Sequence, residues 1–172
     1  CNYLRMQRPS RPMYVSLMFD YFRMPLDWPG RDPAPALALA NRAGAVEDAL
    51  AEDICSAMGN QFDPNRFVPY VQMHELEALI LAQPEALLKE FPEREKAVAE
   101  LAEEVGDLQP EEVNDGPHTA PSKRITKRIP EYAGRKATAA PNVLSVIGVP
   151  TLRQRCPHFD QWIGKLEALP AQ

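Results

Sequence analysis

The pattern of apolar positions in the first half of the chain predicts two strands joined by a helix. Residues 13–19 (MYVSLMF) form a continuous apolar run that stops at Asp20, as expected of a central parallel strand covered by helices. Apolar side chains then recur at helical spacing between residues 43 and 58. Residues 66–73 predict a second strand, in which Pro69 indicates an edge or a bulge. Strand, helix and strand in this order predict a right-handed crossover and a parallel strand pair.

The second half of the chain is predicted to be mainly helical. Residues 92–105 carry a strong apolar stripe that begins with a proline and ends before a glycine. Further helices are expected between Pro121 and Pro130 and from Pro157 to Leu169.

These elements predict an α/β fold, a small parallel sheet followed by a mainly helical C-terminal half. We expect residues 1–172 to form a single domain, with an α/β part at residues 13–82 and a helical part at residues 83–172.

Charge is distributed unevenly along the chain. The 172 residues are 45% hydrophobic and 25% charged, and the net charge of -5 argues against nucleic-acid coating of the whole surface. Residues 85–115 hold eleven acids and three bases, whereas residues 116–155 hold eight bases and one acid. This asymmetry fits either local binding of a polyanion or a pair of solvated helix faces of opposite sign, which is the interpretation we favour.

Cysteine usage and hydropathy indicate the compartment. Cys1, Cys55 and Cys156 form no CxxC pair, which favours a reducing environment. No run of about 18 apolar residues and no charged-then-apolar leader occurs. We therefore expect a cytoplasmic protein without a membrane partner, and a truncated chain because the first residue is not methionine.

The stretch YVQMHELEALIL at residues 70–81 holds the first candidate catalytic residues, His74, Glu75 and Glu77. An HExxH zinc helix is excluded because position 78 is alanine. These residues and Asp20 each follow a predicted strand, and sites in open α/β sheets form at the carboxyl ends of strands.

Clustered carboxylates suit a hard cation such as Mg²⁺ or Mn²⁺, so Asp20, Glu75 and Glu77 are the predicted metal ligands. His74 would orient a water molecule or a phosphate. The alternative that remains open is that Glu75 favours a helix N-terminus and His74 hydrogen-bonds the loop.

A second candidate site lies in NDGPHTAPSKRITKRI, which begins at Asn114. Ser122, Lys123 and Arg124 fall in the first turn of a predicted helix, where N–H groups attract phosphate. Cations at that end oppose the helix dipole. They therefore indicate either substrate binding, with nucleic acid as the anionic partner, or an internal salt bridge, for example with Asp115.

Four blocks in order resemble the DUF4276 family, a bacterial domain of unknown function. They are LMFDYFRMPLDWPG, FVPYVQMHELEALIL, VNDGPHTAPSKRI and CPHFDQWIGKLEAL, between about Met13 and Leu169. Members of that family look Toprim-like and are often encoded beside large ATPases of the recombination-repair type, in mobile or anti-phage loci. The resemblance implies a Toprim-like fold and a metal-dependent nuclease-type domain that works with an ATPase partner.

Two departures from the family pattern modify this expectation. No EG.TE motif precedes Met13, and Phe22 stands at the second position of the Asp-x-Asp motif that Asp20 would open. Glu75 or Glu77 would compensate for the second aspartate. We therefore expect an N-terminally truncated chain with little nuclease activity, and the alternative function is a non-catalytic interaction or structural module.

Overall fold

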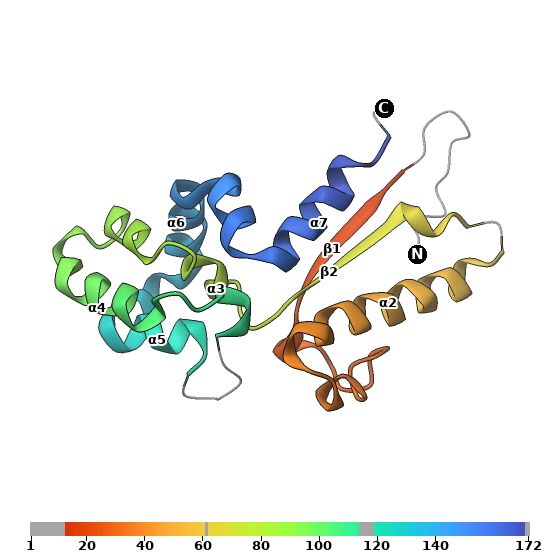
Figure 1. Ribbon diagram of the computed structural model, residues 1–172, viewed down its shortest axis with the longest axis horizontal. Coiled ribbons are helices and arrows are strands. Elements are labelled where there is room, and N and C mark those ends of the chain that lie inside the picture. Colours follow the sequence, from red (N-terminus) through yellow and green to blue (C-terminus); the bar gives the residue numbers. More distant parts are fainter. Residues whose placement is uncertain (1–12, 61, 114–118, 171–172) are drawn as a thin grey trace. The chain divides into compact units, whose positions relative to one another are not determined.

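The computed structural model describes residues 13–60, 62–113 and 119–170, and Figure 1 shows its elements in sequence colours. The strands are β1 (Val15–Asp20) and β2 (Phe67–Gln72). The α-helices are α2 (Leu39–Met58), α3 (Glu77–Ile80), α4 (Glu95–Val105), α5 (Pro121–Arg128), α6 (Tyr132–Arg155) and α7 (Pro157–Glu167). The 3-10 helices are η1 (Tyr21–Arg23), η2 (Ala34–Ala36), η3 (Pro64–Arg66), η4 (Pro84–Lys89), η5 (Pro92–Arg94) and η6 (Pro110–Glu112).

These elements form two compact units. The sheet unit comprises Cys1–Gln72 and Gln161–Gln172, and the helical unit comprises Met73–Asp160. The unit boundaries lie at Gln72 and Asp160. No helix of the described residues is long and apolar enough to cross a membrane.

The predicted α/β fold with a small parallel sheet is confirmed. In the described part of the chain, β1 and β2 form a two-stranded parallel sheet in which Val15 lies opposite Phe67 and Asp20 lies opposite Gln72. Both strands begin and end within one or two residues of the predicted ranges.

The expectation that the first strand is covered on both faces is wrong. Leu17 and Met18 of β1 are 44% and 41% exposed, whereas all six residues of β2 are buried. The reason is that α2 packs against β2. A continuous apolar run predicts a strand, but it does not say which strand of a pair the helix will cover.

The backbone N–H groups of β2 explain why a proline is tolerated in a buried strand. At alternate positions, the Phe67 N–H donates to the Pro64 carbonyl, Pro69 has no N–H, and the Val71 N–H donates to Glu47 Oε1 at 2.7 Å. None of these positions therefore leaves a buried donor without an acceptor. The buried Glu47 carboxylate thus has a structural function at this strand.

The end of α7 completes the sheet unit. The Trp162 ring stacks on Tyr70 at 4.6 Å between centroids, and its Nε1–H donates to Ser16 Oγ at 2.8 Å. The Ser16 hydroxyl in turn donates to the Val68 carbonyl at 2.7 Å. Two strands alone bury too little to be stable in water, so this packing and α2 supply the rest of the core.

The helical unit is built around the short helix α3. Ala78, Leu79 and Ile80 are at most 2% exposed, and they pack against α5, α6 and η4. Other buried core residues of this unit include Leu87, Leu101, Ile125, Ile129, Tyr132 and Val143. This core fixes the start of α3, which carries the candidate site.

Candidate metal centre

The carboxylate of Asp20 lies at the carboxyl end of β1, as predicted, and begins the next element. Its Oδ1 accepts hydrogen bonds from the backbone N–H groups of Phe22 at 2.9 Å and Arg23 at 3.3 Å, which is N-cap geometry for η1. Asp20 belongs to the sheet unit, whereas Glu75 and Glu77 belong to the helical unit. Its role as a metal ligand stays a prediction.

The link between β2 and α3 has an unusual backbone at His74. The φ angle of His74 is 66°, and the residue is only 2% exposed. Few residues other than glycine adopt this left-handed conformation, and such strain often occurs at functional sites. The two candidate glutamates follow directly.

Glu75 and Glu77 converge on one cationic atom, the Nζ of Lys136 in α6. Lys136 Nζ lies 2.9 Å from Glu77 Oε1 and 3.7 Å from Glu75 Oε1. The side chain of Glu77 is 2% exposed, and that of Lys136 is 43% exposed. A carboxylate this deeply buried requires positive or hydrogen-bonding partners. The ammonium of Lys136 provides one, and its side chain is partly exposed to solvent.

Tyr132 fixes Glu77 from inside the core. Its hydroxyl donates to Glu77 Oε1 at 3.1 Å, and the residue is 0% exposed. Burial, followed by the negative charge of Glu77, raises the pKa of the Tyr132 hydroxyl above its ordinary value. The hydroxyl therefore remains a hydrogen-bond donor throughout the neutral pH range.

Glu75 is fixed by the N-terminus of α5. The backbone N–H of Ser122 donates to Glu75 Oε2 at 3.0 Å. The first turn of α5, whose N–H groups are expected from the sequence to attract phosphate, thus binds a carboxylate of the protein itself.

The two cations of the predicted substrate-binding segment differ in environment. Arg124 pairs with Glu104 and also donates from Nε to the Thr119 carbonyl at 2.9 Å. Lys123 is exposed. Arg124 therefore forms an internal salt bridge, which was one of the two alternatives expected from the sequence. Its partner is Glu104. Asp115, the partner considered from the sequence, lies outside the described residues.

The sequence did not indicate Lys136 and Tyr132. They lie 59 and 55 positions after Glu77 in the chain. The sequence contains one indication that they act together. Tyr132 and Lys136 are four positions apart, so both side chains lie on the same face of a helix.

The carboxylates of Glu75 and Glu77 are too few to surround a metal ion completely, but they can hold an ion that keeps part of its water shell. Among residues 13–60, 62–113 and 119–170, no group of three or more His, Cys, Asp or Glu side chains is placed to hold a metal ion. Glu75 and Glu77 offer two carboxylates, and Mg²⁺ is commonly bound by one or two carboxylates while keeping several waters. The chemistry of the pair therefore fits Mg²⁺ or Mn²⁺.

Another buried carboxylate, Glu111, has a structural role. Its Oε2 and Oε1 accept the backbone N–H groups of His158 at 2.9 Å and Phe159 at 2.8 Å, in the first turn of α7. Burial raises the pKa of Glu111, and these two hydrogen bonds oppose that increase. Carboxylate burial alone therefore does not identify a site in this chain.

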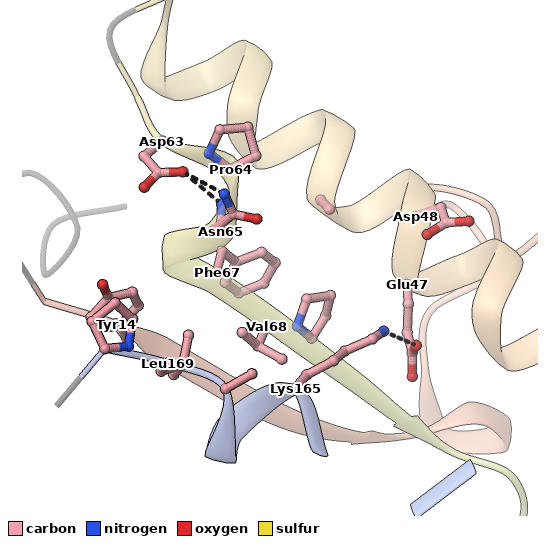
Figure 2. A pocket seen from close by; sticks show the side chains of 14 residues that line it. Tyr14, Glu47, Asp48, Asp63, Pro64, Asn65, Phe67, Val68, Lys165 and Leu169 are labelled. Atoms are coloured by element: carbon pink, nitrogen blue, oxygen red, sulfur yellow. Dashed lines mark hydrogen bonds and ion pairs between the residues drawn. The ribbon is translucent and has the colours of Figure 1, made fainter. Parts of the chain in front are cut away.

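The sheet unit contains a separate hollow of about 600 Å³ (Figure 2). It is lined by Tyr14, Glu47, Asp48, Ala51, Asp63, Pro64, Asn65, Phe67, Val68, Pro69, Lys165, Ala168, Leu169 and Pro170. In Figure 2 the Lys165 side chain extends toward Glu47, with 3.9 Å between Nζ and Oε2. None of the predicted site residues lines this hollow.

Cys156 is expected to react much more slowly with iodoacetamide than Cys55. Burial raises the pKa of the Cys156 thiol to about 12, whereas Cys55 is half-buried. Since the thiolate is the nucleophile, the raised pKa leaves only a very small fraction of Cys156 reactive near pH 8. Peptide mass spectrometry of the native chain should find Cys55 alkylated first, and both at similar rates in urea. Equal rates in the native chain would contradict the buried position of Cys156.

Comparison with known proteins decides the family. The family described as Domain of unknown function (DUF4276) matches residues 2–167. The chain belongs to the DUF4276 family. No curated protein and no solved structure matches this DUF4276 chain. Membership confirms the family resemblance seen in the four sequence blocks, but it assigns no activity.

Proposed function

We propose that this chain binds one Mg²⁺ or Mn²⁺ ion at Glu75 and Glu77 and takes part in metal-dependent phosphodiester chemistry of the nuclease type. The observation that carries the proposal is the convergence of both carboxylates on one cationic position, Lys136 Nζ. When bound, such an ion would stabilise the negative charge that develops on a transferring phosphate.

The residues around the pair support this role by fixing its oxygens. Tyr132 holds Glu77, and the Ser122 N–H holds Glu75, so neither carboxylate has to be reoriented. A site with two protein carboxylates leaves coordination positions for water and for substrate phosphate. His74, which precedes the pair in a strained conformation, would orient the water or the phosphate.

Asp20 is proposed separately as a metal ligand, on the grounds of its position at a strand end and its match to the family aspartate. The matching test is Asp20→Asn, which keeps an oxygen acceptor for the η1 cap. A loss of metal affinity in this variant would support Asp20 as a ligand, and unchanged affinity would remove Asp20 from the proposed ligands.

An ATPase partner and a role in genome or anti-phage defence are proposed from the family resemblance alone. Copurification of the tagged chain with the product of a neighbouring ATPase gene would test the partnership.

The alternative function is a non-catalytic interaction or structural module. A specific observation favours it, since three carboxylate oxygens of the pair already have protein partners. In this alternative the network only ties α3 to α5 and α6, and it needs no ion. Metal binding distinguishes the two functions.

Nucleic acid is the proposed substrate, with Lys123 as a phosphate contact. Lys123→Ala should weaken binding to duplex DNA and reduce the slope of log affinity against log salt by about 0.9, because one phosphate contact is lost. Fluorescence anisotropy over a range of salt concentrations, with Mg²⁺ present, measures both quantities.

The matched control for that experiment is Lys96→Ala, which removes an exposed lysine from α4 of the same unit. This variant should bind as the parent chain does. Equal slopes for the parent and Lys123→Ala, or no binding by the parent, would remove Lys123 from the site.

A further inference from the structure

We infer that the Lys136 ammonium and a divalent cation compete for the Glu75–Glu77 pair, so that Lys136 sets the metal affinity of the site. This inference rests on the proposed function, because it requires that a cation binds at these two glutamates. It assigns a regulatory role to Lys136, a residue that the sequence pattern did not indicate.

Competition follows from where the ammonium lies. Lys136 Nζ is 2.9 Å from Glu77 Oε1, the same oxygen that Tyr132 contacts. A Mg²⁺ ion lies about 2.1 Å from a carboxylate ligand, so an ion on that oxygen would be within about 5 Å of the ammonium. Two cations at that separation repel each other, because water reaches the half-exposed lysine side chain only in part.

Lys136 is the partner that can leave. Its side chain is 43% exposed and sits on a flexible four-carbon stem, so the ammonium recovers hydration when it turns outward. Tyr132 is fully buried and the Ser122 N–H belongs to the backbone of α5. These two donors stay and keep both carboxylates oriented while the cation changes.

The exchange has a consequence for the substrate. A released lysine on α6 remains tethered beside the ion, at the distance of one side chain, where it can pair with a bound phosphate. The same residue thus neutralises the empty carboxylate pair and then becomes available to the anionic ligand.

The competition is tested by measuring Mn²⁺ affinity in variants that remove or keep the positive charge. Lys136→Met removes the ammonium but keeps the length of the side chain, and Lys136→Arg keeps the charge. Lys127→Met is the matched control, since Lys127 is an exposed lysine of α5 in the same unit. Isothermal titration calorimetry gives the affinity, and circular dichroism checks that each variant is folded.

We expect Lys136→Met to bind Mn²⁺ about tenfold more tightly than the parent chain, which is a typical coupling between competing ligands. Lys127→Met should bind as the parent does, and Lys136→Arg, which keeps the positive charge, should stay closer to the parent than Lys136→Met. Mn²⁺ should also raise the melting temperature of Lys136→Met more than that of the parent, because tighter binding stabilises the folded state more.

Different results of this titration would contradict the competition and the metal site itself. Equal affinities of the parent and Lys136→Met, or weaker binding by Lys136→Met, would overturn the competition and leave the metal site in place. Absence of Mn²⁺ binding by both proteins would overturn the metal site itself.

Discussion

Replacing Gly30 by alanine is expected to lower the free energy of unfolding by about 3 kcal/mol. Gly30 has a φ angle of 73°, and a Cβ there would lie 2.8 Å from Ala49 Cβ and 3.1 Å from the Ala45 carbonyl oxygen. The loop between β1 and α2 therefore approaches the helix so closely that only glycine fits. Overpacking against the helix backbone adds to the cost of the left-handed conformation.

Gly59→Ala separates these two costs. Gly59 has a φ angle of 84°, but an added Cβ meets nothing within 4 Å. Its replacement by alanine should lower the free energy of unfolding only by the cost of the left-handed backbone conformation, about 1 to 2 kcal/mol. Urea denaturation of both variants gives the comparison, and an equal loss in the two would show that Gly30 is not in close contact with α2.

The strands and α2 were predictable because their signals are local. The apolar runs placed both strands to within one or two residues, and Gly59 ended the helix as expected, with its N–H donating to the Cys55 carbonyl. Pro69 also gave a correct signal, since its missing N–H falls at a position of β2 that β1 does not use.

Helix α6 was not predicted, because its sequence contains the usual signals for a helix end. Pro141 and Pro150 lie within Tyr132–Arg155, and Gly148 has non-helical angles that mark a kink between two helical segments. Pro150 opens the second segment, where its missing N–H has no helical partner to lose. Pro141 lies inside the first segment, and no local rule predicts that a helix continues through it.

The candidate site was only partly predictable for a similar reason. Their placement after a predicted strand indicates His74, Glu75 and Glu77 as candidates from the sequence alone. The partners of the two glutamates, Ser122, Tyr132 and Lys136, are between 47 and 61 positions later in the chain. Such pairs depend on how α5 and α6 pack on α3, which the hydrophobic pattern of one sequence does not specify.

Changing both glutamates to glutamine is expected to lower Mn²⁺ affinity by at least about 100-fold. Each glutamine keeps a carbonyl oxygen that can accept from Tyr132 or the Ser122 N–H, so the fold is retained while the ligand charge is lost. Glu100→Gln, at an exposed position of α4, removes a carboxylate elsewhere in the helical unit and should leave affinity unchanged.

The most direct test of the central claim is calorimetric titration of Mn²⁺ into the parent chain, Glu75→Gln/Glu77→Gln and Glu100→Gln. We expect one site per chain in the parent and in Glu100→Gln, and loss of that site in the double variant. Undiminished binding by the double variant, or no binding by the parent, would contradict a metal site at Glu75 and Glu77.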